Sequence, residues 1–147
     1  MIYWFTGQPG AGKTVLGNKL RHHLSFTRQT PIKLIDGDDI RKLYSNTDYS
    51  IKGRIYNVDI AQKLSHYLHN EGFKVIVCMV SPYLDQREEF KELLGNNITE
   101  IYVHTSEIRE RDNFHVKGYQ PPTKNYINID TTYETPEESI EKIINNI

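Results

Sequence analysis

The sequence predicts an α/β fold built around a mainly parallel sheet. Short apolar and β-branched stretches alternate along the 147 residues with stretches whose apolar residues recur at helical spacing. A glycine-bearing loop at residues 7–14 stands between the first such strand and the first such helix. The run from Lys74 to Val80 is nearly all apolar, which is typical of a strand that is buried on both faces of a parallel sheet.

The other elements follow from the same two periodicities, in chain order. We expect the remaining strands at residues 2–6, 32–35, 100–104 and 126–130, the last of them a short edge strand. We expect helices at residues 15–24, 40–43, 54–70, 84–94 and 105–112, and a final helix from residue 136. A capping box at Thr135 to Glu138, with Pro136 in the first turn, marks where that final helix begins. Its isoleucines form one stripe that should pack into the core: 140, 143, 144 and 147.

Composition and charge limit the class of protein. Hydrophobic residues make up 37% and charged residues 25%, so we expect one globular domain over residues 1–147. The formal net charge of -1 argues against a nucleic-acid or membrane partner held by a general basic field. The only cysteine, Cys78, lies in the apolar run and suits a reducing compartment. Without a charged leader or an apolar span long enough for a bilayer, we expect a cytoplasmic protein.

Residues 7–14 fit the phosphate-binding pattern G-x-x-x-x-G-K-[ST]. Glycines let consecutive N–H groups curve around phosphate oxygens, and the next helix points its positive end at the same anion. Lys13 would supply a mobile cation for the β- and γ-phosphates, and the Thr14 hydroxyl is placed to ligate Mg²⁺. We therefore predict a site for ATP and Mg²⁺. Its nucleotide-binding residues would be Gly7, Gln8, Pro9, Gly10, Ala11, Gly12, Lys13 and Thr14.

Acidic residues follow the second predicted strand at Asp36, Asp38 and Asp39. The carboxyl ends of strands are where open α/β sheets bind ligands, so these acids suit a metal-side or base carboxylate. The alternative is a capped turn in which Asp39 begins a short helix. Further along, Arg54 and Asn57 share one face near the start of a helix, which suits ligand binding and plain solvation equally well.

A long loop bearing glycine and proline follows at residues 113–125. Loops of this length are more often functional than idle, and its lysines suggest a mobile lid over ATP, although a surface loop without function is the alternative. We place the lid at about residues 109–125. We expect Arg109 or Arg111, at the start of this lid, to neutralise the γ-phosphoryl group during transfer.

Among nucleotide-using proteins, a small-molecule kinase fits best. A GTPase would carry N-K-x-D, which the sequence at residues 18–21 fails at its last position, and a motor-type ATPase would need a longer chain. The loop, the metal-side acids and the lid together predict a three-layer P-loop nucleoside triphosphate hydrolase or kinase fold. They also predict small-molecule substrates, namely ATP and a nucleotide-like acceptor.

Several motifs resemble adenylylsulfate kinase, and they occur in the same order over most of the chain. They are residues 4–7 with 12–14, D-G-D-D-I-R at 36–41, V-S-P-Y at 80–83, R-D at 111–112, K-G-Y at 117–119, and the segment 129–136. The resemblance implies transfer of a phosphoryl group from ATP to the 3′-hydroxyl of adenylylsulfate, which gives 3′-phosphoadenylylsulfate in sulfate assimilation. It also implies that the chain could form a homodimer.

The resemblance assigns roles by position. It makes Lys13, Asp36, Asp38, Arg109 and Arg111 the catalytic set, with Asp36 and Thr14 on Mg²⁺ and Asp38 on the acceptor hydroxyl. The remaining acceptor residues would be Arg41, Tyr49, Arg54, Asn57, Val80, Ser81, Lys117 and Tyr126. Tyr126 falls on a phenylalanine that stacks on adenine in that family, and tyrosine can keep that stacking.

The sequence also departs from the family pattern. Residues 8–11 differ, the lid is rearranged, the segment between the lid and Tyr126 is shortened, Asp39 replaces an asparagine, and Asp59 replaces an arginine. We expect each charge change to weaken a doubly anionic acceptor by about 1–3 kcal/mol if desolvated. Two alternatives therefore stay open at this point. One is a kinase of the same frame for another nucleotide-like or small-molecule acceptor, and the other is a nucleotide-binding regulator without transfer activity.

Overall fold

A computed structural model describes residues 1–26, 30–109 and 114–147. Within these residues the strands form one parallel sheet in the order β2-β3-β1-β4-β5. Their bounds are β1 Ile2–Thr6, β2 Ile32–Asp36, β3 Lys74–Cys78, β4 Ile98–His104 and β5 Tyr126–Asp130. The predicted parallel α/β fold is confirmed, and β5 is an edge strand as predicted.

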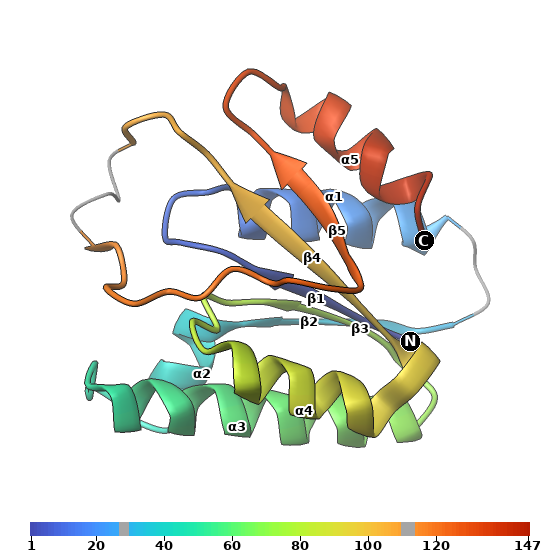
Figure 1. The fold of residues 1–147 in the computed structure, drawn as a ribbon. Coiled ribbons are helices and arrows are strands. Elements are labelled where there is room, and N and C mark those ends of the chain that lie inside the picture. The colour runs from blue at the N-terminus through green and yellow to red at the C-terminus, as the bar shows by residue number, and fades with distance from the viewer. Residues whose placement is uncertain (27–29, 110–113) are drawn as a thin grey trace.

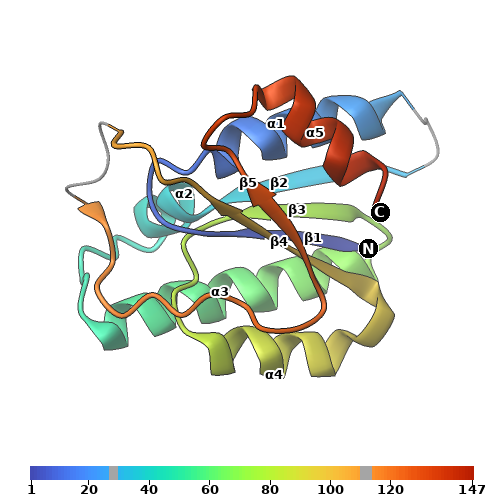
Figure 2. The ribbon, with the colours of Figure 1, turned by 45° about the horizontal axis from the view of Figure 1, so that its top comes forward.

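Helices cover both faces of the sheet, which gives three layers (Figure 1, Figure 2). One face carries α1 Lys13–Ser25 and α5 Pro136–Ile144. The other carries α2 Gly37–Leu43, α3 Ile51–Asn70 and α4 Leu84–Leu94, and a short 3₁₀ turn, η1 Gly95–Asn97, follows α4. In the described part of the chain, no helix is long and apolar enough to cross a bilayer.

The core has two halves because the central strand β1 is buried on both faces. Tyr3 and Phe5 point toward α1 and α5, while Ile2 and Trp4 point toward α3 and α4. The apolar stripe of α1 is buried in the first half at Leu16, Leu20 and Leu24. The apolar stripe of α3 packs into the second half at Val58, Ala61, Leu64 and Leu68.

Some element boundaries differ from the predictions. The helix α3 begins at Ile51, because the Ser50 hydroxyl accepts a hydrogen bond from Gly53 N and thereby caps it. The residue that caps α2 is Asp36, whose side chain accepts from Asp38 N, and not Asp39. Ile147 lies beyond the end of α5 and is exposed, so it does not extend the apolar stripe.

The helix predicted at residues 105–112 is wrong for the described part, since residues 105–109 are not helical. Two threonine hydroxyls take the backbone N–H groups that would face the start of such a helix. Thr132 accepts from Ser106 N at 2.9 Å, and Thr105 accepts from Glu107 N at 3.1 Å. These two bonds hold the chain in a turn after β4.

Candidate nucleotide and acceptor site

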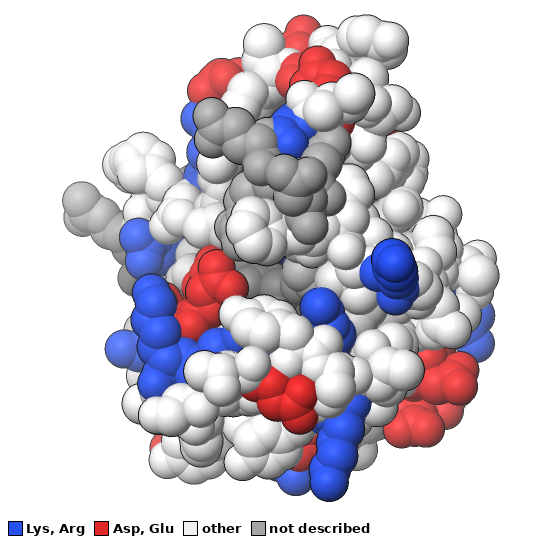
Figure 3. Space-filling view, turned by 90° about the vertical axis from the view of Figure 1, so that its left-hand side faces the viewer, with Lys and Arg blue, Asp and Glu red and all other residues white. Residues whose placement is uncertain are grey.

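The carboxyl ends of β1, β2 and β3 open into a cleft of about 1220 Å³. Figure 3 looks onto this end of the molecule, where basic and acidic side chains lie beside one another. The cleft brings together most of the residues predicted for the two substrates. They are Pro9, Gly10, Gly12, Lys13, Thr14, Asp36, Asp38, Arg41, Tyr49, Arg54, Asn57, Val80 and Ser81.

The phosphate loop has the backbone that an anion site requires. Gly7 fits tightly against the sheet, where an added Cβ would lie 2.0 Å from the Val103 carbonyl oxygen. Gly12 begins α1 with a φ of 108°, a conformation that favours glycine, and no side chain caps this helix. The first N–H groups of an uncapped helix are therefore available to phosphate oxygens.

Lys13 lies folded back across the loop. Its Nζ donates to the carbonyl oxygens of Gly7 at 2.8 Å and Gln8 at 2.7 Å, and the residue is buried. The ammonium group is thus held at the mouth of the loop, on the side that faces the cleft. A cation in this place can move onto the outer phosphates of a nucleotide without a change in the backbone.

Thr14, at the start of α1, meets Asp36, at the end of β2. The Thr14 hydroxyl donates to Asp36 Oδ2 at 2.9 Å, and Asp36 Oδ1 accepts from Asp38 N at 2.9 Å. The pair offers only oxygen donors, which fits Mg²⁺, a hard cation that usually keeps several waters and substrate phosphates as ligands. Among the described residues no three acidic, histidine or cysteine side chains gather as a metal site of their own. Any Mg²⁺ here would therefore depend on the nucleotide for further ligands.

The other half of the cleft is basic and aromatic. The guanidinium carbon of Arg41 lies 4.1 Å from the centre of the Tyr49 ring, and that of Arg54 lies 5.7 Å from it. Arg41 also donates to the carbonyl oxygens of Asn46 and Asp48, and Arg54 to that of Tyr49. Burial lowers the pKa of Arg41 from its ordinary value, yet an arginine so placed stays protonated at neutral pH.

Asn57 and Ser81 complete the wall between the two halves. Asn57 is buried and donates to the Gly37 carbonyl oxygen at 3.3 Å, while its Oδ1 has no hydrogen-bond partner among the described residues. Ser81 has a φ of 44°, which is uncommon for a residue with a side chain. Trp4 Nε1 donates to Ser81 Oγ at 3.1 Å, and Arg87 Nη1 donates to its carbonyl oxygen at 2.5 Å. These bonds hold the strained backbone in place.

Comparison with known proteins agrees with this geometry. Residues 1–143 match the sequence model of the family described as adenylylsulphate kinase. The chain belongs to the adenylylsulfate kinase family. The adenylyl-sulfate kinase of Pseudomonas aeruginosa is 34% identical over 143 residues, which cover 93% of this chain and 72% of that protein. That of Clostridium kluyveri is 28% identical over 142 residues, with 93% and 71% covered.

Solved structures of the adenylylsulfate kinase family share the fold. The Mycobacterium tuberculosis enzyme in complex with AMPPNP and APS superposes with a TM-score of 0.81 at 18% identity, over 98% of this chain and 95% of that chain. A hexameric APS kinase from Thiobacillus denitrificans gives 0.78 at 25% identity, over 97% and 27%. Shikimate kinase from Aquifex aeolicus gives 0.60 at 18%, over 99% and 95%, so the fold extends to other P-loop kinases.

Two of the departures from the adenylylsulfate kinase pattern lie outside the cleft. Asp39 is exposed and pairs with Lys42 at 3.5 Å, and Asp59 pairs with Lys63 one helical turn away at 2.8 Å. Because both carboxylates have a neighbouring cation and face solvent, their charge is largely screened. The structure does not support the predicted loss of acceptor affinity at these positions.

The lid differs most from its prediction. Tyr126 lies in β5, in register with Glu100, with its ring edge-on to Tyr102 at 6.2 Å between centroids. Tyr126 does not line the cleft, and its stacking on adenine stays a prediction. Lys117 is exposed in a turn outside the cleft. Arg111 lies outside the described residues.

Part of the predicted mobile lid is attached to the phosphate loop. The Gln8 side chain takes both backbone groups of Val116, with Nε2 donating to the carbonyl oxygen at 3.0 Å and Oε1 accepting from the amide at 2.8 Å. The hydroxyls of Tyr119 and Thr6 lie 2.8 Å apart. Gln8 therefore contributes through its side chain, a role that the motif pattern does not reveal.

Sequence reasoning missed several residues of the site. Lys42, Phe114 and His115 also line the cleft. Lys42 follows Arg41 on α2, and two adjacent basic residues beside the predicted acceptor site could have indicated that Lys42 also faces the ligand. Phe114 and His115 come from the long loop, where no periodicity indicates which side chains turn inward.

Proposed function

We propose that this chain transfers the γ-phosphoryl group of ATP to the 3′-hydroxyl of adenylylsulfate. Membership of the adenylylsulfate kinase family supports the reaction class. The observation that carries the proposal is the content of one cleft: Lys13 and Thr14 of the phosphate loop, the carboxylate of Asp38, and the cations Arg41 and Arg54. The cleft thus offers a cation and a hydroxyl for the donor phosphates, a carboxylate that can act as a base, and two cations for an anionic acceptor.

In this proposal the chain mainly positions and neutralises charge, as phosphoryl transfer requires. The amides at the start of α1 and the Lys13 ammonium hold the phosphates of ATP. Mg²⁺, held by Thr14 and Asp36, would supply further positive charge to those oxygens. As the acceptor oxygen bonds to the γ-phosphorus and the bond to ADP breaks, Asp38 takes the hydroxyl proton. Arg111 stays the predicted lid cation.

The acceptor half suits a ligand with adjoining anionic groups and a planar base. Arg41 and Arg54 would bind the phosphosulfate, and the buried Oδ1 of Asn57 needs a donor, which an acceptor hydroxyl or amino group can supply. The exposed Tyr49 ring offers an apolar face for a base. Other nucleotide-like acceptors share part of this chemistry, so the acceptor is the point to test.

The test is a transfer assay with ATP, Mg²⁺ and a panel of acceptors, in which products are separated by charge. We expect adenylylsulfate to be used with the highest kcat/KM. Asp38→Asn should lower kcat by about 10²–10⁴-fold with ATP binding kept, the range of one general base. The matched control is Asp39→Asn, which removes the neighbouring exposed carboxylate and should leave kcat within about twofold of the wild type.

Two outcomes would replace the proposal. Faster transfer to another acceptor would make the chain a kinase of the same frame with a different substrate. ATP binding without any phosphorylated product across the panel would make it a nucleotide-binding regulator. The assembly is a separate question, and light scattering of the full chain tests the predicted homodimer.

A further inference from the structure

A phosphate loop turns N–H groups toward its anion, so the carbonyl groups of the same peptides turn away and need donors of their own. Most of these carbonyls find donors nearby. Lys13 Nζ serves Gly7 and Gln8, and Leu16 N serves Gly12 at 3.0 Å. The carbonyls of Gly10 and Ala11, at the tip of the loop, are served from two segments far away in sequence.

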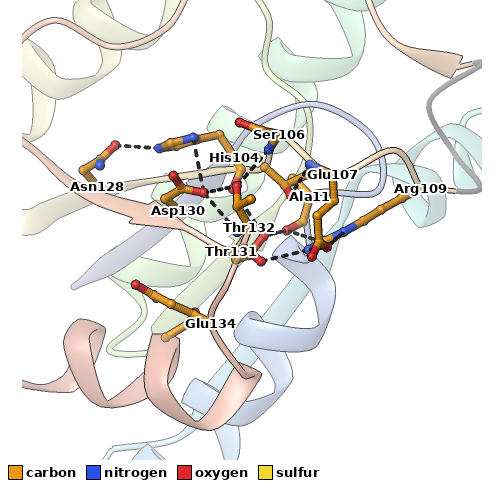
Figure 4. A network of polar contacts seen from close by, with 12 residues as sticks. Ala11, His104, Ser106, Glu107, Arg109, Asn128, Asp130, Thr131, Thr132 and Glu134 are labelled. Atoms are coloured by element: carbon orange, nitrogen blue, oxygen red, sulfur yellow. Dashed lines mark hydrogen bonds and ion pairs between the residues drawn. The ribbon is translucent and has the colours of Figure 1, made fainter.

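Those segments are the chain after β4 and the chain after β5 (Figure 4). Arg109 Nη1 donates to the carbonyl oxygens of Gly10 at 3.1 Å and Ala11 at 3.3 Å. The Thr131 hydroxyl has two acceptors within reach, Ala11 O at 3.0 Å and His104 O at 3.2 Å, and the shorter distance is to Ala11. Neither Arg109 nor Thr131 lines the cleft, so both reach the loop from its outer side.

Both donors are themselves fixed. Arg109 donates through Nε and Nη2 to one carboxylate oxygen of Glu107, at 3.1 and 2.8 Å, and through Nη2 to the Thr131 carbonyl oxygen at 3.0 Å. Thr131 is buried, and its backbone N–H donates to His104 O at the end of β4 at 2.8 Å. The three side chains of Glu107, Arg109 and Thr131 form an outer brace that joins the loop to the sheet.

The geometry of a peptide unit links this brace to the anion site. Ala11 C=O and Gly12 N–H belong to one planar unit and point in opposite directions. Two donors on the carbonyl therefore fix the direction of the Gly12 N–H, which is the first donor of the uncapped α1. Donors on a carbonyl also polarise the peptide and strengthen the bond that its N–H makes.

We propose that Thr131 and Arg109 are positioning residues for the phosphates of the nucleotide, acting through the Ala11–Gly12 peptide. This inference rests on the proposed function only for the phosphate site and not for the acceptor. It replaces the expectation that Arg109 meets the γ-phosphoryl group directly. Such contact would require the guanidinium to give up its bonds to Gly10, Ala11 and Thr131.

The experiment measures binding of Mg²⁺-inorganic triphosphate and of Mg²⁺-ATP by calorimetry, without acceptor, on the full chain. Thr131→Val keeps the shape and removes the hydroxyl, and it should weaken both ligands about five- to tenfold, the worth of one net hydrogen bond. Thr131→Ser keeps the hydroxyl and should bind within about twofold of the wild type. Arg109→Lys keeps the charge but cannot span two carbonyls, and it should lose at least as much as Thr131→Val.

Wild-type triphosphate affinity in Thr131→Val would overturn the proposal, as would equal losses in Thr131→Ser and Thr131→Val. Full affinity in Arg109→Lys would likewise show that charge alone matters, as a direct contact would require. Because acceptor is absent, these readings are separate from the transfer reaction. The proposed function can fail in the acceptor panel while the brace is upheld, and the reverse can also occur.

Discussion

Replacing Arg87 with methionine should strongly lower the free energy of unfolding. Arg87 on α4 and Glu100 on β4 are both almost fully buried, and Arg87 Nε donates to Glu100 Oε1 at 2.7 Å. The same guanidinium donates to the carbonyl oxygens of Ser81 at 2.5 Å and Gln120 at 2.6 Å. One side chain thus joins α4, the sheet, the segment after β3 and the lid.

The size of the loss follows from what the substitution leaves behind. Removing one partner of a buried ion pair costs about 3–5 kcal/mol, and the low end applies because Lys91 still donates to Glu100 Oε2 at 2.6 Å. The carbonyls of Ser81 and Gln120 would each lose a buried donor, for about 1 kcal/mol apiece. The expected total of roughly 4–5 kcal/mol is a large part of the 5–15 kcal/mol typical of a whole domain.

Urea unfolding followed by the fluorescence of the only tryptophan, Trp4, would measure this loss. The control is Lys63→Met, which breaks an exposed pair with Asp59 on α3 and should cost no more than about 0.5 kcal/mol. Arg87→Met combined with Glu100→Leu should recover part of the loss, because no buried charge is then left alone. A loss below about 1 kcal/mol in Arg87→Met, or a double variant weaker than the single one, would refute this reasoning.

Three other predictions test the fold and its pH dependence. Gly17→Ala should lower the free energy of unfolding by about 1–3 kcal/mol although alanine favours helices, because its Cβ would lie 2.3 Å from Cys78 Sγ. Thermal unfolding measures this loss, and adding Cys78→Ala to the variant should relieve it. Hydrogen bonds from Thr132 lower the pKa of Asp130 below its ordinary 3.8, so this carboxylate stabilises the fold above that pH and the effect fades as pH falls through the folded pKa. The stability difference between wild type and Asp130→Asn, followed against pH, should accordingly shrink in acid; a difference that stayed constant would contradict it. Thr135→Ala should cost about 0.5–2 kcal/mol in urea unfolding, because it removes the hydroxyl that accepts from Glu138 N at the start of α5, while the backbone N–H of residue 135 can still donate to Glu138; no change would mean that packing alone fixes this helix.

The elements with local signals could be predicted from the sequence. The start of α5 follows from the capping box of Thr135 and Glu138, and the bounds of β1 follow from its apolar run before the glycine loop. The ends of helices and strands that depend on partners far away in the sequence could not be predicted. The hydroxyl of Thr132, from beyond β5, holds the turn after β4, and nothing in the sequence near Ser106 indicates that bond.

The same distinction between local signals and distant partners holds for the residues of the site. Residues within contiguous motifs, such as Lys13, Thr14 and Asp36, lie where they were predicted to lie, because each motif fixes one strand end and one helix start. Tyr126 was predicted in a short edge strand, and it lies in β5 in register with Glu100. The partner of β5 could not be predicted from nearby residues, because strand pairing is a property of the whole sheet.

The lid is held to the rest of the molecule by polar contacts at several points. A loop from residue 114 to 125 has little apolar surface with which to hold itself in place, since Val116 is one of its few buried residues. At one end it is held by Gln8, which binds both backbone groups of Val116, and by Thr6, which meets Tyr119. Further along, Gln120 N donates to Pro82 O at 2.8 Å, and Gln120 O accepts from Arg87 at 2.6 Å. Phosphate binding depends on the backbone of residue 8 and leaves its side chain free to anchor the lid. The lid therefore joins the phosphate loop to the segment after β3 and to α4.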